Sequence, residues 1–372
     1  MARIIFMGTP DFAMESLSAL YDAGHEILAV ITNPDRPKGR GMKLVASPVK
    51  QYALSKNLQV FQPEKVRNNI EFINSLKEMK PDFICVVAYG KILPKEILDI
   101  PSKGCINVHG SLLPKYRGAA PIQWAVLNGD KETGITTMYM DVGMDTGDMI
   151  LTEKVEIGDT ETTGELWARL AKIGGQLLVK TIAEIEAGTA PRIKQPEEFS
   201  MAPMLSKDMA KIDWKNKGVQ EIINLIRGLN PIMGAYTIIG GKKTKIWKAE
   251  KVDNAVDILP DIAQFENGDI VYANDKVGLF IKAKDGILSI LEIQPENSKR
   301  MGFGDYVRGF CAKKESDKVG FWYNILEKCW FFGFVVVLYE WCKCRGMKEK
   351  SYAKSKNGWK PCGCTHTHTL YY

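Results

Sequence analysis

The chain has 372 residues, of which 45% are apolar and 25% are charged. These values are ordinary for a globular protein and exclude a disordered, collagenous or fibrous chain, while the length suggests two or three domains. The longest uncharged apolar run, Cys329–Tyr339, has 11 residues, whereas a membrane-spanning helix needs about 20. Only four apolar residues follow Arg3, too few for the core of a secretory leader. We therefore expect a cytoplasmic protein.

The net charge of +6 is concentrated near the end of the chain. Residues 311–372 hold 11 Lys/Arg and 5 Asp/Glu, which leaves the first 310 residues with no net charge. The same tail holds six of the eight cysteines, so the rest of the chain has the low cysteine content of a reduced compartment. Any nucleic-acid affinity of residues 1–310 must come from local basic clusters rather than from overall charge.

The first thirty residues predict a strand, a helix and a second strand. A short apolar strand begins at Arg3, a helix over 11–23 follows, and 27–31 is again apolar. The alternation continues with helices over 69–79, 121–127 and 161–187 and with strands over 83–88, 105–109 and 135–140. This order predicts an α/β domain over residues 1–189, with a doubly wound, mostly parallel, Rossmann-like sheet. Its ligands are expected in the crevice beyond the carboxyl ends of the strands.

The second half of the chain has a different pattern of predicted elements. Residues 190–208 include three prolines without periodicity, and we interpret them as a linker. Over 209–310, one helix (219–227) precedes short extended runs at 236–239, 244–249, 268–273, 278–283 and 286–293. This pattern predicts a second, smaller β-barrel domain of the oligonucleotide-binding (OB) type. The composition changes abruptly over 311–372, which suggests a disordered or frame-altered tail.

Asn107 and His109 stand two residues apart at the end of the strand predicted over 105–109. Because side chains alternate along a strand, the amide and the imidazole share one face. Such a pair at a strand end can donate two hydrogen bonds to one developing oxyanion. The alternative is structural: a buried histidine satisfied by the backbone, beside a turn-forming asparagine.

A second polar loop follows the next apolar strand, with Asp145 between Gly143 and Gly147. The glycines allow a tight loop that holds Asp145 in the crevice, where a carboxylate favours a protonated His109. The alternative is a solvated acidic turn. Because no reactive Ser or Cys stands at a nucleophile elbow, the set suggests acyl transfer without a covalent enzyme intermediate.

Several motifs resemble the methionyl-tRNA formyltransferase family. They are the segments 8–13 (GTPDFA), 33–41 (NPDRPKGRG) and 88–94 (AYGKILP), together with the cluster over 104–118. The resemblance runs from residue 3 to about residue 309. The Asn-x-His…Asp core is common to formyltransferases that use 10-formyltetrahydrofolate, whereas the PDRP loop and the barrel point to the branch specific for tRNA.

The resemblance implies an enzyme that transfers a formyl group from 10-formyltetrahydrofolate to the α-amino group of methionyl initiator tRNA. Asn107 and His109 would polarise the formyl carbonyl, and Asp145 would keep His109 protonated and help to deprotonate the amine. We further expect a monomer that uses no metal ion. The residues it implies for the folate site are Ser111, Leu112, Leu113, Pro114, Ala88, Tyr89, Gly90, Ile92, Leu93, Val142 and Gly143.

Two basic clusters are candidates for tRNA contact. The Gly-rich loop 34–43 carries four cations, Arg36, Lys38, Arg40 and Lys43, which suit phosphate contacts but also suit a solvated loop. Lys243 and Lys245 belong to a lysine stripe on one predicted strand. The stripe predicts a surface for the tRNA backbone, although lysines also protect an edge strand from aggregation.

Three other functions fit parts of the sequence. A formyltransferase acting on an amino sugar nucleotide shares the catalytic core, but the basic loop and the lysine stripe argue against it. A dinucleotide-dependent oxidoreductase is disfavoured because segment 8–13 lacks the G-x-G-x-x-G spacing. The intact set of Asn107, His109 and Asp145 argues against a non-catalytic tRNA-binding protein.

The tail offers one weak metal-site pattern. It consists of two C-x-C pairs and one H-x-H pair: Cys342, Cys344, Cys362, Cys364, His366 and His368. Their spacing is not that of the usual C-x-x-C knuckle, so no metal is assigned.

Overall fold

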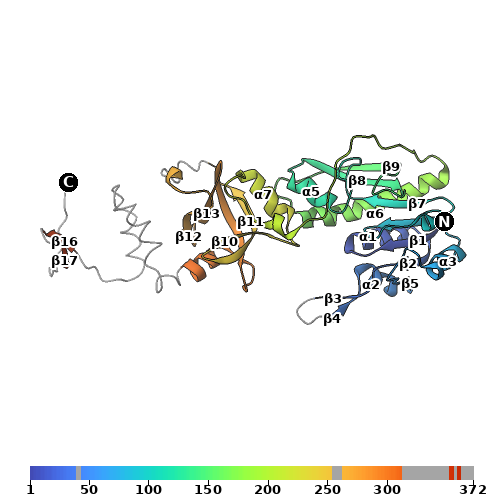
Figure 1. The fold of residues 1–372 in the computed structure, drawn as a ribbon, viewed down its shortest axis with the longest axis horizontal. Helices are drawn as coiled ribbons and strands as arrows, with labels where there is room; N and C mark the ends of the chain where they lie inside the picture. The colour runs from blue at the N-terminus through green and yellow to red at the C-terminus, as the bar shows by residue number, and fades with distance from the viewer. Residues whose placement is uncertain (39–42, 254–261, 312–351, 356–357, 362–372) are drawn as a thin grey trace. The chain divides into compact units, whose positions relative to one another are not determined.

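The computed structural model describes residues 1–38, 43–253, 262–311, 352–355 and 358–361. The chain divides into two compact units, Met1–Arg308 and Gly309–Tyr372. Within the first unit, one seven-stranded and one six-stranded sheet form two domains (Figure 1). In the described ranges, no helix has the length and apolar character that a membrane crossing requires.

The seven-stranded sheet has the order β5-β2-β1-β6-β7-β8-β9. Its strands are β1 (Arg3–Gly8), β2 (Glu26–Ile31), β5 (Val60–Phe61), β6 (Phe83–Val87), β7 (Cys105–His109), β8 (Glu132–Tyr139) and β9 (Met149–Glu156). The neighbouring strands β5, β2, β1, β6 and β7 pair in parallel. β8 pairs antiparallel with β7 and with β9. The predicted mostly parallel α/β sheet is confirmed. The sequence reasoning missed the two edge strands, because β5 has two residues and β9 is largely exposed.

Both faces of this sheet are covered by helices, as alternate residues of β1 illustrate. Ile4 and Phe6 belong to one buried cluster, and Ile5 and Met7 belong to another. The helices that contribute to the first cluster are α1 (Asp11–Asp22), α2 (Pro48–Ser55), α5 (Pro121–Leu127) and α6 (Thr163–Ala187). Those that contribute to the second are α3 (Ile70–Glu78) and α4 (Lys95–Leu98). This two-sided burial explains why the strand sequences are continuously apolar.

The strand order reverses direction beside β1. The chain leaves β1 for β2 on one side and later enters β6 on the other side of β1. In a parallel sheet, such a reversal opens a crevice beyond the carboxyl ends of the strands. Gly8, Val87 and His109 end β1, β6 and β7 at this edge.

The second domain is built on an antiparallel sheet with the order β10-β11-β14-β13-β12, and β15 pairs with β14. Its elements are α7 (Val219–Gly228), β10 (Ala235–Ile239), β11 (Lys242–Lys251), β12 (Ile270–Asn274), β13 (Gly278–Ala283), β14 (Gly286–Pro295), β15 (Met301–Gly302) and α9 (Phe303–Tyr306). The predicted helix and five strands are confirmed, and β15 is additional. The buried guanidinium of Arg227 donates to Gly158 O at 2.9 Å, so α7 is bonded to the first domain.

Two further pairs of strands complete the described chain. The hairpin of β3 (Arg36–Lys38) and β4 (Lys43–Val45) begins within the basic loop 34–43 and ends two residues beyond it. The second unit contains the paired strands β16 (Tyr352–Ser355) and β17 (Gly358–Pro361). The six Cys and His residues of the tail pattern lie outside the described residues. Within the described residues, no three metal-ligating side chains cluster.

The contact between α1 and α6 gives a test of this packing. A Cβ atom at Gly175 would lie 3.0 Å from Glu15 O and 3.1 Å from Ala19 Cβ. We predict that Gly175→Leu lowers the free energy of unfolding by ~1–3 kcal/mol, because the two helices must separate. Urea denaturation measures this change. The matched control is Gln176→Leu on the exposed side of α6, and an equal loss in both variants would contradict the packing argument.

Candidate active site

Asn107, His109 and Asp145 meet beyond the carboxyl end of β7. His109 Nδ1 lies 3.6 Å from Asp145 Oδ2, and Asn107 Nδ2 donates to Asp145 Oδ1 at 3.4 Å. His109 is buried, while Asn107 and Asp145 are half-buried. The amide and the imidazole therefore share one face of β7, as their spacing predicts, and the carboxylate lies against both.

The two ring nitrogens of His109 have different partners. Nε2 lies 2.8 Å from the carbonyl oxygen of Tyr116. Because a carbonyl oxygen only accepts hydrogen bonds, Nε2 carries a hydrogen, and Nδ1 is the nitrogen that faces Asp145. It follows that Nδ1 is the position at which the ring can gain or lose a proton in the crevice.

The end of β8 does not lie beside His109, and Asp145 reaches this position because of the way its loop folds. β8 runs antiparallel to β7, so its last residue, Tyr139, pairs with Ile106. Tyr139 N donates to Asp148 O at 2.9 Å, so the loop leaves and returns at the same place. A Cβ atom at Gly147 would lie 1.8 Å from Tyr139 O, so only glycine fits this close return. The middle of the loop then carries Asp145 to His109.

The Asp145 carboxylate is oriented by a backbone group as well as by side chains. Gly118 N donates to Asp145 Oδ2 at 2.9 Å. Asp145 itself has a φ of 54°, a left-handed conformation that costs a non-glycine residue roughly 1–2 kcal/mol. The surrounding hydrogen bonds must offset this cost, so the carboxylate is held in one place rather than free in solvent.

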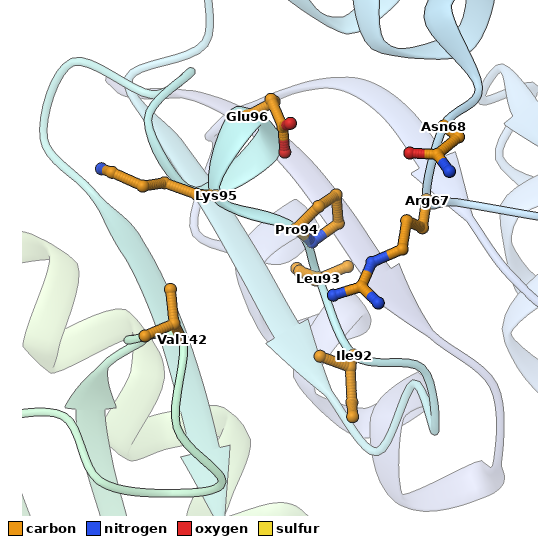
Figure 2. A pocket seen from close by; sticks show the side chains of 8 residues that line it. All are labelled: Arg67, Asn68, Ile92, Leu93, Pro94, Lys95, Glu96 and Val142. Atoms are coloured by element: carbon orange, nitrogen blue, oxygen red, sulfur yellow. The ribbon is translucent and has the colours of Figure 1, made fainter.

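A pocket of about 290 Å³ is lined in part by Val142, which belongs to the loop that carries Asp145. Figure 2 shows the guanidinium of Arg67 turned toward Ile92 and Leu93, with Val142 on the other side of that segment. The lining residues are Arg67, Asn68, Ile92, Leu93, Pro94, Lys95, Glu96 and Val142. The pocket thus combines apolar walls with cationic groups, and it brings together three of the residues predicted for the folate site.

The predicted residues of the turn after β6 are placed at the same edge of the sheet. Ala88 and Gly90 have positive φ values of 45° and 77° and form a tight turn around Tyr89. The Tyr89 side chain is buried in the core, and this burial raises the pKa of Tyr89 to about 12. Its carbonyl oxygen accepts from Asn33 Nδ2 at 2.8 Å, which joins the turn to the segment after β2.

The loop Ser111–Pro114 is held by internal hydrogen bonds. The hydroxyl of the fully buried Ser111 donates to Lys115 O at 2.6 Å. Thr136 Oγ1 donates to Ser111 O at 2.7 Å and accepts from Leu113 N at 3.1 Å. Ser111 and Leu113 therefore shape the loop, and Leu112 and Pro114 are its half-buried members.

The basic loop is fixed at its base by a polar cluster. Lys50 Nζ and Gln62 Nε2 donate to the Asp35 carboxylate at 2.6 Å and 2.8 Å, and these bonds hold the pKa of Asp35 below its usual value. Arg36 is exposed. Arg40 lies outside the described residues, and of Lys38 and Lys43 only the backbone is described.

The two predicted lysines of β11 lie beside aromatic rings on one face of the strand. Lys243 Nζ is 3.8 Å from the centre of the Tyr236 ring, and Lys245 Nζ is 5.1 Å from that of Trp247. Partial burial and the neighbouring Lys243 lower the pKa of Lys245. This face therefore joins positive charge to aromatic surface.

The two cysteines of the first domain are not candidates for nucleophiles. Cys85 and Cys105 are free and buried. Burial raises the pKa of both thiols, that of Cys105 to about 12. Because the thiolate is the reactive form, neither thiol supplies a nucleophile near neutral pH.

Three residues of this region were not predicted as site residues: Arg67, Arg117, which lies in the cluster over 104–118, and Gln195. Arg67 lies between β5 and α3, in a segment without a motif. Arg117 and Gln195 are buried and bonded to each other at 2.9 Å, although they stand 78 positions apart in the chain. No local pattern signals such a pair.

Comparisons with known proteins show which family and fold this chain resembles. The family profile "Formyl transferase" matches residues 2–182, and "Formyl transferase, C-terminal domain" matches 204–311. A methionyl-tRNA formyltransferase of Caldanaerobacter subterraneus subsp. tengcongensis is 49% identical over 308 residues, which cover 82% of this chain and 96% of that protein.

Two solved structures share the fold at lower identity. An N-formyltransferase from Helicobacter canadensis, in complex with folinic acid and dTDP-3-aminofucose, is 22% identical with a TM-score of 0.56, and the match covers 79% of this chain and all of that one. HypX from Aquifex aeolicus, in complex with tetrahydrofolic acid, is 14% identical with a TM-score of 0.56. That match covers 83% of this chain and 48% of HypX.

Proposed function

This chain belongs to the methionyl-tRNA formyltransferase family, and from that premise we propose that its crevice transfers a formyl group from 10-formyltetrahydrofolate to methionyl initiator tRNA. The observation that carries the proposal is the convergence of Asn107, His109 and Asp145. Residues 1–189 are the proposed catalytic domain, 190–208 the connector and 209–310 the tRNA-binding domain. The proposed enzyme is monomeric and cytoplasmic and uses no metal ion.

The proposed reaction is a direct acyl transfer. The α-amino nitrogen of the methionyl group attacks the formyl carbon, and the carbonyl oxygen becomes an oxyanion. The bond from this carbon to N10 of the folate then breaks, and the proton that the amine loses ends on N10. Tetrahydrofolate and formyl-methionyl-tRNA are the products.

Each of the three side chains has a distinct role in this proposal. Asn107 Nδ2 and a protonated His109 Nδ1 donate hydrogen bonds to the oxyanion, which is the charge that develops in the transition state. Asp145 stabilises the protonated ring and accepts the amine proton. The hydrogen bond from His109 Nε2 to Tyr116 O fixes the ring for this task.

The pocket lined in part by Val142 is the proposed site of the folate donor. Ile92, Leu93 and Val142 supply apolar walls for its rings, and Arg67 supplies a positive charge for the carboxylates of its glutamyl end. The turn 88–90, Gly143 and the loop 111–114 form the rest of the proposed donor site. Guanidinium groups bind carboxylates through paired hydrogen bonds.

The choice of acceptor is the first test of this function. We predict formyl transfer to charged initiator tRNA and no transfer to an amino sugar nucleotide, because basic clusters suit an extended polyanion. From the family we also predict a kcat/KM for charged initiator tRNA at least ~10-fold above that for charged elongator tRNA. Assays offering the three acceptors with the same donor measure this. Preferential formylation of the sugar nucleotide would support the sugar-specific alternative.

The second test concerns the oxyanion. His109→Ala removes one donor and should lower kcat by ~10²–10³-fold, with KM for both substrates nearly unchanged. His25→Ala, which changes a half-buried histidine at the start of β2, is the matched control and should keep its activity. A His109→Ala enzyme with normal kcat would exclude the role of the imidazole.

The third test concerns the donor pocket. Arg67→Ala should raise KM for 10-formyltetrahydrofolate by ~10-fold, about the loss of one charge-assisted contact, and leave KM for tRNA unchanged. Lys65→Ala, an exposed cation of the same segment, serves as the control. An unchanged KM for the folate would place its glutamyl end elsewhere.

The fourth test concerns the face of β11 that carries Lys243 and Lys245. Replacing both lysines by alanine should raise KM for tRNA. It should also reduce the slope of the logarithm of the binding constant against the logarithm of the salt concentration by about two, one for each lost phosphate contact. Lys276→Ala, in the exposed turn between β12 and β13, should change neither quantity. If tRNA affinity is unaffected by the double replacement, these lysines only protect the strand.

A further inference from the structure

The connector between the two domains lies along both loops of the proposed catalytic centre. Ile193 exchanges two backbone hydrogen bonds with Met149, at 2.8 Å and 2.9 Å. Further along, Ser200 O accepts from Arg117 N at 2.8 Å, and Ser200 Oγ accepts from Tyr116 N at 2.9 Å. The connector is thus bonded to β9, beside the Asp145 loop, and to the loop that holds His109 Nε2.

One side chain of this connector is buried between the two loops. Gln195 is 8% exposed, and its Nε2 donates to Asp145 O and to Gly147 O, both at 2.8 Å. Its Oε1 accepts from Arg117 Nε at 2.9 Å. Both N–H groups of the amide therefore donate a hydrogen bond, and its oxygen accepts one.

These bonds act on the two parts that orient the Asp145 carboxylate. On one side they hold the backbone of Asp145 in its left-handed conformation, with a φ of 54°. On the other side they hold Arg117, whose neighbour Gly118 donates its N–H to Asp145 Oδ2. The position of the carboxylate relative to His109 therefore depends on the length and polarity of residue 195.

We infer that Gln195 is a positioning residue for the proposed reaction, acting through Asp145 rather than on a substrate. The inference rests on the proposed function, since it matters for catalysis only if Asp145 takes part in formyl transfer. It also gives the connector a second role besides joining the domains. A misplacement of about 1 Å at a reacting group can cost ~10²-fold in rate.

The chemistry of the amide makes this position selective. A glutamate at 195 would keep an acceptor for Arg117 but would set carboxylate oxygens against the carbonyl oxygens of Asp145 and Gly147. A methionine would match the length of the side chain and remove all three hydrogen bonds. The two variants disturb the Asp145 loop in different ways and replace no residue of the proposed donor pocket.

The experiment measures formyl transfer to charged initiator tRNA by the full chain carrying Gln195→Met, and separately by Gln195→Glu. We expect kcat to fall by ~10–100-fold in both variants, while KM for the folate and for tRNA stays within ~3-fold. In an Asp145→Asn background, Gln195→Met should lower kcat by less than ~3-fold, because the carboxylate that it positions is already absent.

Thr181→Val is the matched control for loss of a buried hydrogen bond. Thr181 Oγ1 lies 2.8 Å from Thr137 Oγ1 and donates to Leu177 O at 2.7 Å. These bonds join α6 to β8 and include no residue of either loop. Thr181→Val should lower the melting temperature as Gln195→Met does, with kcat unchanged. If Gln195→Met fails to fold, the kcat and KM of Gln195→Glu, which retains the Arg117 contact, decide the question.

Three results would overturn the inference. They are an unchanged kcat in the folded variants, an equal fold-loss with and without the Asp145 carboxylate, and a change confined to KM. If the wild-type chain transferred no formyl group, the proposed function would fail and the inference with it. An active wild type beside fully active Gln195 variants would overturn the inference alone.

Discussion

A carboxylate held against a buried imidazole is the interaction on which the proposed chemistry depends. Asp145 accepts hydrogen bonds from Gly118 N and Asn107 Nδ2 and faces His109 Nδ1. Its backbone is left-handed, so the surrounding contacts must stabilise a conformation that the residue disfavours alone. This arrangement fixes where charge is available before any substrate binds, as electrostatic preorganisation requires.

The sheet makes that arrangement possible in two steps. The parallel strands β1, β6 and β7 end at one edge and open the crevice, which is a general consequence of reversed strand order. The loop after the antiparallel strand β8 begins and ends beside Tyr139, and Asp145 lies in the middle of this loop. The connector bonds this loop, through Gln195, to the backbone segment that contacts His109. The geometry of the proposed centre and the domain connection are thus parts of one hydrogen-bonded structure.

Much of the fold and of the proposed centre could be predicted from local patterns. Continuous apolar segments, alternating with segments whose apolar residues recur at helical spacing, predicted the α/β sheet. The two-residue spacing of Asn107 and His109 predicted that their side chains share one face of the strand. Long-range features could not be predicted in this way. The direction of β8 depends on pairing with β7, which strand sequence does not encode. The bond between Arg117, in the cluster over 104–118, and Gln195 joins residues 78 positions apart, and Arg67 lines the proposed donor pocket from a segment without periodicity.

The most direct test of the central claim is the kcat of Asp145→Asn for formyl transfer to charged initiator tRNA at saturating folate. The substitution keeps the size of the side chain and removes the charge that faces His109. A catalytic carboxylate predicts a loss of at least ~10²-fold in kcat, with both KM values nearly unchanged and the fold intact. A kcat within ~3-fold of that of the wild-type chain would contradict it and leave Asp145 as a structural residue of its loop.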